Sequence, residues 1–403
     1  MRLRTFSLVA LPQRWVVLSG LFLGRIVFGF GLQSMAVVAP GVAEDLSLDT
    51  AEIGTLIGFF MLPGVVLALP GGLLAHWFGE WRVITLALIA TTAGAALSAT
   101  GDAFFLIAAG RLLCGMGAIV VTVVMTKVVI DWFARHEMAT AMGIFLAGYP
   151  AGMGLALVTL GPLATAEDWR LGLYACASLS FVCLLVFWVT YRPVSAASNP
   201  VPTSAKLNRR EIGMVTLSAT VGSLYNGGYL IMLSFVPLYL IGRGLTPAEA
   251  TAAIGVGVWV SIAAVPLGGA LADWLRRPNL IMVAGACVWG TGTALVPLFA
   301  EQPGALWVIF GLSSLIGAIP VGVMISLSAE VMRPQVRGVG TGLFYTWFYG
   351  VAAAAPAFAG FVINQTSPLV AIYLTVSCAI ATIFCLLVFR MAQRLFPRVE
   401  QAR

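Results

Sequence analysis

Long apolar runs occupy almost the whole sequence, and charges or clusters of Pro, Gly and Asn separate each run from the next. A run of roughly 20 apolar residues is long enough to cross a bilayer as a helix. The last uncharged stretch is too long for one crossing, and the turn-forming segment from Asn364 to Pro368 divides it. The punctuation predicts twelve membrane-spanning helices, at residues 15–40, 52–74, 82–101, 104–129, 138–162, 170–191, 212–240, 249–272, 279–300, 305–329, 338–362 and 369–390.

Charged residues are scarce: they make up 9% of the 403 residues, whereas hydrophobic residues make up 60%. A soluble domain averages about 25% charged residues, so we expect an all-α integral membrane protein with little mass outside the bilayer. The net charge of +6 therefore gives no indication of nucleic-acid binding. The positions of the basic residues instead predict the topology of the chain in the membrane. No motif supplies a nucleophile with its base, and the six cysteines lack metal-ligand spacing. We expect no catalytic residues, no metal, no cofactor and no enzyme activity.

Basic residues outside the runs fall mainly in one set of loops and in both tails, while the opposite loops hold only Arg170 and Arg243. Loops on the cytoplasmic side of a membrane are enriched in Lys and Arg. An even number of crossings also places both termini on one side. We therefore expect a multi-pass protein of the cell membrane, in particular a bacterial inner membrane, with both termini in the cytoplasm.

The one long polar connection, residues 192–211, is rich in Pro, Ser and Asn and predicts a flexible cytoplasmic linker. It separates two six-helix halves, residues 1–191 and 212–403. Three short matches relate the halves at an offset of roughly 200 residues, which favours an internal repeat. The matching pairs are Gly71-GLLAHW with Gly268-GALADW, Gly117-AIVV with Gly317-AIPV, and Cys183-LLVF with Cys385-LLVF.

Four local patterns resemble the major facilitator superfamily, and the resemblance covers the whole chain. The loop Gly72-LLAHWFGEWR resembles the family's G-x3-D-R-x-G-x-R motif, and Arg111-LLCGMGA is close to its R-x3-G-x-G-A motif. Asp131-WFARHEMATAMG resembles the WF-x3-E/R-G-x-A-x-G signature, and Asp168-Trp-Arg before the sixth span is also usual in the family. The stretch Thr126-KVVIDWFARHEMATAMGIF most resembles the cyanate and nitroimidazole permease branch.

The resemblance implies a major facilitator fold, in which two parallel six-helix repeats rock about a substrate site near the membrane midplane. It also implies that the protein acts as a monomer. It assigns His76, Arg82, Asp131 and Asp273 to gating of the cytoplasmic side. His76 replaces the aspartate of the family's motif, and a neutral imidazole cannot favour a helix N-terminus as a carboxylate does. Because the repeat-related Asp273 is intact, we expect a weakened or one-sided inner latch.

Arg25 lies alone in the middle of the first apolar run, and no acidic residue lies inside any run to neutralise it. An arginine at such a depth costs several kcal/mol and is retained mainly where it faces a polar cavity or a partner. At ~1.5 Å of rise per residue, Arg25 and Arg111 differ in depth by only ~5 Å. The resemblance implies that their two helices both line the central cavity. Two guanidinium groups could then bind a carboxylate or similar planar anion. The alternative for Arg111 is that it bonds carbonyls of a neighbouring helix.

Polar and aromatic residues near mid-span are candidates for the rest of a substrate site. Gln33 lies about two turns beyond Arg25. An asparagine in hydrocarbon needs a partner, which favours a cavity or an interhelical hydrogen bond for Asn226. The other candidates are Tyr149, Tyr225 and Tyr229; helix packing is the commoner role of such aromatic residues.

Every Asp and Glu maps to the end of a span or to a loop, and both histidines map to cytoplasmic loops. A conventional proton relay through a buried acid is therefore not expected. The remaining options are co-transport of a proton with the anion, exchange of anions, use of Asp49 and Glu52 at the outer ends, or uniport.

These observations predict a secondary active or facilitative transporter of a small anionic substrate. Organic carboxylates, cyanate and nitrate-like ions all remain open. Two alternatives are an exporter of hydrophobic or drug-like compounds, in which Arg25 is only structural, and a non-transporting receptor or assembly partner with the same fold.

Overall fold

The computed structural model describes residues 13–68, 70–133, 138–163, 169–191, 207–333 and 336–396. Throughout these ranges the chain is built from helices and short connections, with no β-strand. The described residues form twelve helical segments that are long and apolar enough to cross a membrane. This confirms the all-α fold and the twelve predicted spans.

The crossings fall into two halves, and two crossings are interrupted. Pro63 separates α2 from α3 in the second crossing, and Pro320 separates α12 from α13 in the tenth, since proline has no backbone N–H to continue a helix. The first half holds α1 (Gln13–Leu46), α2 (Thr50–Phe59), α3 (Gly64–Leu67), α4 (Pro70–Phe78), α5 (Glu80–Ala99), α6 (Phe104–Trp132), α7 (Met138–Leu160), η1 (Gly161–Leu163) and α8 (Trp169–Thr190). The second half holds α9 (Arg209–Gly242), α10 (Pro247–Leu275), α11 (Pro278–Leu295), η2 (Val296–Leu298), α12 (Pro303–Ala318), α13 (Val321–Val331), α14 (Arg337–Gln365) and α15 (Val370–Leu395).

Capping boxes fix where three of the helices begin. Asp49, Asn208 and Thr246 each accept a hydrogen bond from a backbone N–H three residues on, and the glutamate there bonds back to the cap. Because Asn208 is such a cap, α9 begins at Arg209, and the last three residues of the predicted linker are helical. The rest of that linker, residues 192–206, lies outside the described residues.

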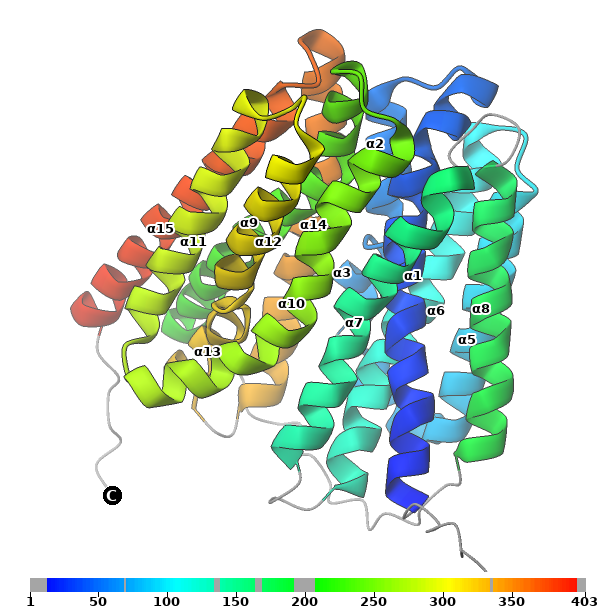
Figure 1. Cartoon of the computed structure of the whole chain (residues 1–403). Coiled ribbons are helices and arrows are strands. Elements are labelled where there is room, and N and C mark those ends of the chain that lie inside the picture. Colours follow the sequence, from blue (N-terminus) through cyan, green and yellow to red (C-terminus); the bar gives the residue numbers. More distant parts are fainter. Residues whose placement is uncertain are drawn as a thin grey trace, which may run out of the picture.

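The two halves stand side by side, and α1 begins at the same end of the bundle at which α15 finishes (Figure 1). We call this end the terminal face and the other end the opposite face. Toward the terminal face the helices of the two halves diverge, whereas they converge toward the opposite face (Figure 1).

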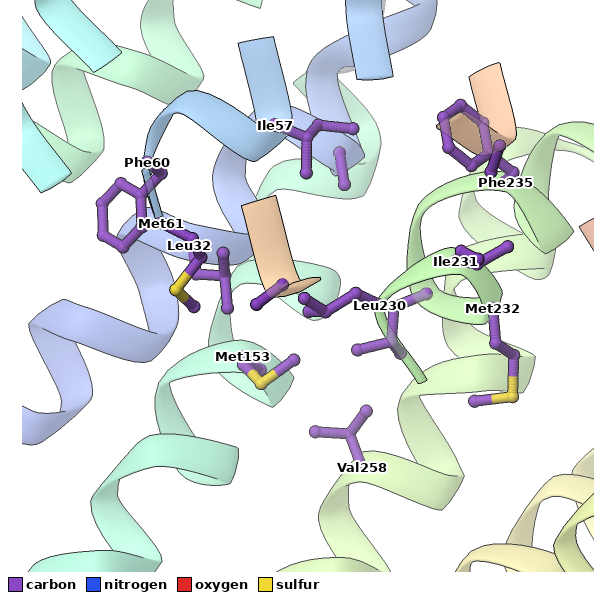
Figure 2. Close-up of a cluster of buried hydrophobic side chains, with 14 of the residues drawn as sticks. Leu32, Ile57, Phe60, Met61, Met153, Leu230, Ile231, Met232, Phe235 and Val258 are labelled. Atoms are coloured by element: carbon purple, nitrogen blue, oxygen red, sulfur yellow. The ribbon is translucent and has the colours of Figure 1, made fainter. Parts of the chain in front are cut away.

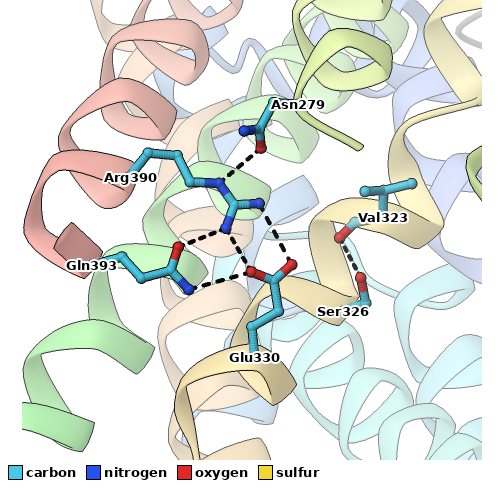
Figure 3. A network of polar contacts seen from close by, with 6 residues as sticks. All are labelled: Asn279, Val323, Ser326, Glu330, Arg390 and Gln393. Atoms are coloured by element: carbon cyan, nitrogen blue, oxygen red, sulfur yellow. Dashed lines mark hydrogen bonds and ion pairs between the residues drawn. The ribbon is translucent and has the colours of Figure 1, made fainter. Parts of the chain in front are cut away.

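Each half is tied together near the terminal face by a polar network, and the two networks occupy corresponding helices. In the second half Arg390 of α15 bonds Asn279 of α11, at 2.7 Å, and Glu330 of α13, at 2.5 Å (Figure 3). The first half carries Tyr191 after α8, Glu80 on α5 and a Lys127–Asp131 pair on α6, and both Tyr191 and Lys127 bond Glu80. The cation comes from α6 in one half and from α15 in the other. The agreement of positions supports the internal repeat predicted from the sequence.

Apolar side chains from both halves form one continuous core, which runs through the second half and joins the first half beneath the opposite face. Figure 2 shows Leu32 and Phe60 of the first half in the same cluster as Leu230, Ile231 and Phe235 of the second. The free energy gained by removing apolar side chains from water is roughly proportional to the apolar area that is buried. A second core, around Val121 and Phe187 and nearer the terminal face, consists of first-half residues only.

Glycines bring α2 and α14 into backbone contact across the boundary between the halves. A Cβ atom added at Gly54 would lie 2.2 Å from the Pro356 carbonyl oxygen, and one at Gly58 would lie 2.1 Å from that of Ala353. At the end of the same seam the Thr50 N–H donates to the Asn364 side chain at 2.9 Å. The structure is therefore closed between the halves at the opposite face.

Candidate functional site

Arg25 lies where α1 and α7 approach most closely, and three glycines create that approach. A Cβ atom at Gly148 would lie 2.9 Å from the Arg25 Cβ, and one at Gly29 would lie 2.1 Å from the Tyr149 carbonyl oxygen. A Cβ atom at Gly152 would likewise lie 2.1 Å from the Ile26 carbonyl oxygen. Such spacing requires residues without side chains and is a common device for packing helices in membranes. It places the side chains of Arg25 and Tyr149 beside each other.

The guanidinium of Arg25 is surrounded by aromatic rings. Its central carbon lies 5.3 Å from the ring centre of Phe28, 5.6 Å from that of Phe145 and 5.4 Å from that of Tyr149. Tyr345 and Tyr349 of α14, in the other half, are also electrostatic neighbours. Cation–π contacts of this kind contribute about 0.5–2 kcal/mol each, but they leave the N–H donors of the guanidinium free.

No described residue forms a hydrogen bond or an ion pair with Arg25, and its Nε is buried without a partner. A buried donor without a partner carries a penalty of about 1–3 kcal/mol, and more for a charged group. An anion that accepts from the guanidinium would remove that penalty and neutralise the charge, and a carboxylate would fit its two parallel donors.

Tyr149 connects Arg25 to a cavity of about 130 Å³ at mid-depth in the bundle. The Tyr149 hydroxyl lies beside the amide of Asn226 on α9. The cavity is lined by residues of α7, α9, α10, α11, α12, α13 and α14, so both halves contribute to its wall. Arg25 stands behind Tyr149 and is not itself part of this lining.

Four of the predicted site residues meet at this cavity, namely Tyr149, Tyr225, Asn226 and Tyr229. The Tyr225 hydroxyl donates to the Gly317 carbonyl, and its ring packs against Trp289 at 4.7 Å between centres. The Asn226 Oδ1 is buried without a hydrogen-bond partner. The cavity therefore combines aromatic walls with an unpaired polar atom, and their contact with substrate stays a prediction.

Gln33 lies elsewhere, at the boundary between the halves. It is 2% exposed, and its Nε2 donates to the Leu233 carbonyl of α9 at 3.5 Å. This contact lies within the apolar core that joins the halves, not in the lining of the cavity. A role in substrate binding remains a prediction for Gln33, and its observed partner is the opposing half.

Arg111 bonds backbone carbonyls of neighbouring helices, as the alternative reading of its motif anticipated. It is 2% exposed, its Nε donates to Leu56 at 3.2 Å, and one terminal nitrogen donates to Gly31 at 2.7 Å. Its guanidinium carbon also lies 4.7 Å from the ring centre of Phe60. Arg111 thus joins α6 to α1 and α2, away from the lining of the cavity.

Replacing Arg111 should therefore lower stability before it alters substrate recognition. In Arg111→Ala two buried carbonyls lose charged donors, and we expect the free energy of unfolding to fall by about 2–4 kcal/mol. The measurement is the thermal unfolding temperature of detergent-purified protein. The affinity of whatever protein folds should stay within a few-fold of wild type. Normal stability combined with lost anion binding would instead place Arg111 in the substrate site.

The predicted gating residues are only partly described. Arg82 is exposed at the start of α5, and Asp131 pairs with Lys127 at 2.8 Å within α6. The side chains of His76 and Asp273 lie outside the described part of the structure. A gating role for all four stays a prediction.

Trp289 is a wall residue that the sequence alone did not indicate. It is 2% exposed, lines the cavity from α11, and its Nε1 is buried without a hydrogen-bond partner. Its side chain fits because Gly228 and Gly317 leave room, since added Cβ atoms there would lie 3.0 Å from the Trp289 ring and 2.9 Å from the Trp289 Cβ, respectively. The available signal was its place near the middle of a predicted span, the same criterion that selected Tyr225 and Asn226.

Comparison with known proteins gives the context of this site. The sequence model of the Major Facilitator Superfamily matches residues 21–356. The hexuronate transporter of Bacillus subtilis (strain 168) is 22% identical, covering 86% of this chain and 87% of the relative. The cis,cis-muconate transport protein of Acinetobacter baylyi is 25% identical with the same coverage. A chloramphenicol efflux pump of Mycobacterium tuberculosis is 24% identical over 78% of each chain.

Solved structures show the same fold. A bacterial homologue of the human lysosomal transporter Spinster, in an inward-facing unoccupied conformation, superposes with a TM-score of 0.71 at 16% identity. That likeness covers 98% of this chain and 100% of the other. A mutant of the nucleoside transporter NupG superposes with a TM-score of 0.76 at 12% identity, covering 94% of this chain and 100% of the other.

Proposed function

Because the chain belongs to the Major Facilitator Superfamily, we propose that it is a carrier that moves a small organic carboxylate across the membrane by alternating access. The anionic substrate is supported above all by the environment of Arg25. This cation has no ionic or hydrogen-bonding partner among the described residues, and it lies beside Tyr149, which lines the cavity. The named cargoes of two relatives, hexuronate and muconate, are carboxylates and support the same class.

The positive-inside rule assigns the terminal face to the cytoplasm, because the loops there carry most of the Lys and Arg residues. The opposite face is sealed by the apolar core and by the glycine contacts between α2 and α14. We therefore assign this conformation to the state that exchanges substrate with the cytoplasm. The protein would reside in a bacterial inner membrane and work as a monomer, since one chain forms the whole cavity.

In the carrier cycle, Arg25 holds the carboxylate while the two halves rock about the cavity. Tyr345 and Tyr349 of α14 are electrostatic neighbours of Arg25, so substrate bound at Arg25 would lie close to both halves. The chain holds no acid or histidine in the middle of a span to relay a proton. Uniport, anion exchange, and entry of a proton together with the carboxylate are the modes consistent with this composition.

A second candidate function is export of hydrophobic, drug-like compounds. It is favoured by the aromatic and largely apolar wall of the cavity, which includes Tyr225, Trp289, Phe344 and Phe348, and by the efflux relative. In that case Arg25 would be structural, held by its cation–π contacts alone.

Counterflow in proteoliposomes separates the two functions. Vesicles loaded with unlabelled carboxylate should accumulate labelled carboxylate through the purified protein, and competing carboxylates should suppress the signal. Lipophilic cations should compete weakly or not at all. Suppression by lipophilic compounds with no response to any carboxylate would reject the carboxylate carrier in favour of the exporter.

A further inference from the structure

Each half has a proline inside a helix that lines the seam near the opposite face. Pro40 lies within α1 and Pro237 lies within α9. A proline has no backbone N–H, so it cannot donate to the carbonyl four residues earlier in its helix. The carbonyls deprived of this helical donor are those of Ala36 in α1 and Leu233 in α9. A buried carbonyl without a donor is disfavoured, so each needs a partner from outside its own helix or access to water.

Gln33 supplies such a partner to α9 from the other half. Its Nε2 on α1 donates to the Leu233 carbonyl at 3.5 Å. Gln33 is buried among the apolar residues that join the halves, where its amide has left water. The contact therefore gives a partner to two buried polar groups, one from each half. Because the donor and the acceptor belong to different halves, this hydrogen bond exists only while the halves are closed at this seam.

The contact is built on one side of the repeat only. Pro40 and Pro237 have the same offset as the first of the sequence matches between the halves, so the repeat relates them to each other. That offset places Leu230 at the position equivalent to Gln33. A leucine side chain has no donor, so it cannot make the equivalent contact with the Ala36 carbonyl. The two halves therefore differ at the residue that makes the hydrogen bond.

A second cavity, of about 110 Å³, lies at this seam. Pro40 lines it from the first half, and Ser234 and Pro237 line it from the second. Ser234 follows Leu233 in the chain and is 7% exposed. Separation of the halves at the opposite face would open this cavity to water, which would then hydrogen-bond the Leu233 carbonyl in place of Gln33.

We propose that Gln33 and Pro237 together form a hydrogen-bonded latch of the gate at the opposite face. Pro237 frees the Leu233 carbonyl, and Gln33 binds that carbonyl only in the state that is closed at this face. Water replaces Gln33 when the halves separate, so the carbonyl has a partner in both states, and Gln33 biases the equilibrium toward the closed one. The latch rests on the alternating access of the proposed function and does not depend on the identity of the cargo.

The test follows the state of the gate through a cysteine at the second cavity. Ser234→Cys is introduced into the full chain, and a bulky maleimide that does not cross membranes is added outside right-side-out vesicles. Both halves cover position 234 while the gate is closed, so the labelling rate follows the fraction of protein that is open outward. Protein without Ser234→Cys corrects for the native cysteines. Gly58→Leu, whose side chain cannot fit against Ala353 in the closed seam, gives the rate for an opened gate.

Gln33→Met keeps an unbranched side chain of similar length but removes the N–H donors. We expect it to raise the labelling rate at least about 5-fold, because the closed state then holds a buried carbonyl without a donor. Pro237→Ala restores the N–H that the Leu233 carbonyl lacks within α9. In that background Gln33→Met should change the rate by less than about 2-fold, since the carbonyl no longer depends on Gln33.

Pro40→Ala is the matched control, because it restores the equivalent N–H in α1 and leaves the Leu233 carbonyl without one. In that background Gln33→Met should retain its full effect of about 5-fold or more. Leu32→Met, one residue away in the same core, controls for a methionine at this depth and should keep the rate within about 2-fold. Each comparison is made within one background, so any change that a proline replacement itself makes to the helix cancels.

Unchanged or slower labelling in Gln33→Met would overturn the latch, and so would equal acceleration in the Pro237→Ala and Pro40→Ala backgrounds. Either result leaves the carboxylate carrier intact, because the labelling needs no substrate. A cysteine at position 234 that stays unlabelled even with Gly58→Leu would show that the seam does not open. That result would overturn the latch together with the alternating access on which it rests.

Discussion

Arg25→Gln should reduce carboxylate counterflow by about 25-fold or more while leaving the protein folded. The wild-type guanidinium supplies a full positive charge and paired donors, and loss of one partner of a buried, hydrogen-bonded charge pair costs about 2–5 kcal/mol. At 1.4 kcal/mol for each factor of ten, this corresponds to at least a 25-fold loss of affinity. Folding should survive because Arg25 makes no hydrogen bond or ion pair with the described residues.

Arg25→Lys is the matched control that separates the effect of the positive charge from the effect of the guanidinium geometry. Lysine retains the positive charge but has no planar fork, so it should recover only part of the counterflow. Both variants are measured with initial rates at several substrate concentrations, and unfolding temperatures confirm that they are folded. Wild-type rates in Arg25→Gln at low substrate would show that this arginine does not hold the cargo.

Gly58→Leu should stop the transport cycle by preventing closure at the opposite face. A side chain there would collide with the Ala353 carbonyl of α14, because even a Cβ atom would lie 2.1 Å from its oxygen. Overpacking costs about 1–3 kcal/mol, and here the cost falls on the closed state alone. Counterflow should fall by about 10- to 100-fold, while ligand still raises the unfolding temperature because Gly58 does not line the cavity.

The closure can be followed with a disulfide between cysteines placed at positions 50 and 364, whose wild-type residues are joined by a 2.9 Å hydrogen bond. This pair should cross-link readily in the wild-type background and poorly with Gly58→Leu. Gly143→Leu is the matched control, since a Cβ atom at Gly143 meets nothing within 4 Å. Efficient cross-linking and normal counterflow in Gly58→Leu would contradict the assignment of this seam as a gate.

The helices could be predicted from the sequence because the bilayer imposes a length on every apolar run. The boundaries were less certain where local chemistry decides them. Asn208 caps α9 through Glu211, and this moved the helix start into residues predicted as linker. The interruptions at Pro63 and Pro320 leave their crossings apolar, so hydropathy did not distinguish them from continuous helices.

The sequence predicts the depth of each candidate residue along its helix, and this was enough to find part of the candidate site. Tyr149, Tyr225, Asn226 and Tyr229 were chosen by depth, and the fold brings them to one cavity. Depth does not specify which way a side chain faces. The sequence predicts Arg111 at nearly the depth of Arg25, yet its guanidinium donates to the carbonyls of Gly31 and Leu56.

Contacts between residues on different helices could not be predicted from one sequence. The room for Trp289 comes from Gly228 on α9 and Gly317 on α12, and neither glycine is a neighbour of Trp289 in the chain. The contact of Arg25 with Tyr149 likewise depends on the close approach of α1 and α7 at Gly29, Gly148 and Gly152.

Thermal unfolding of purified wild type and Arg25→Gln with a panel of small carboxylates tests the central claim most directly. A ligand that binds the folded state raises its apparent stability by about 2.7 kcal/mol at 100 times its dissociation constant. We predict that one class of carboxylate raises the unfolding temperature of the wild type by several degrees and leaves Arg25→Gln unchanged. Equal stabilisation of both proteins, or stabilisation by lipophilic compounds alone, would contradict a carrier that holds an anion at Arg25.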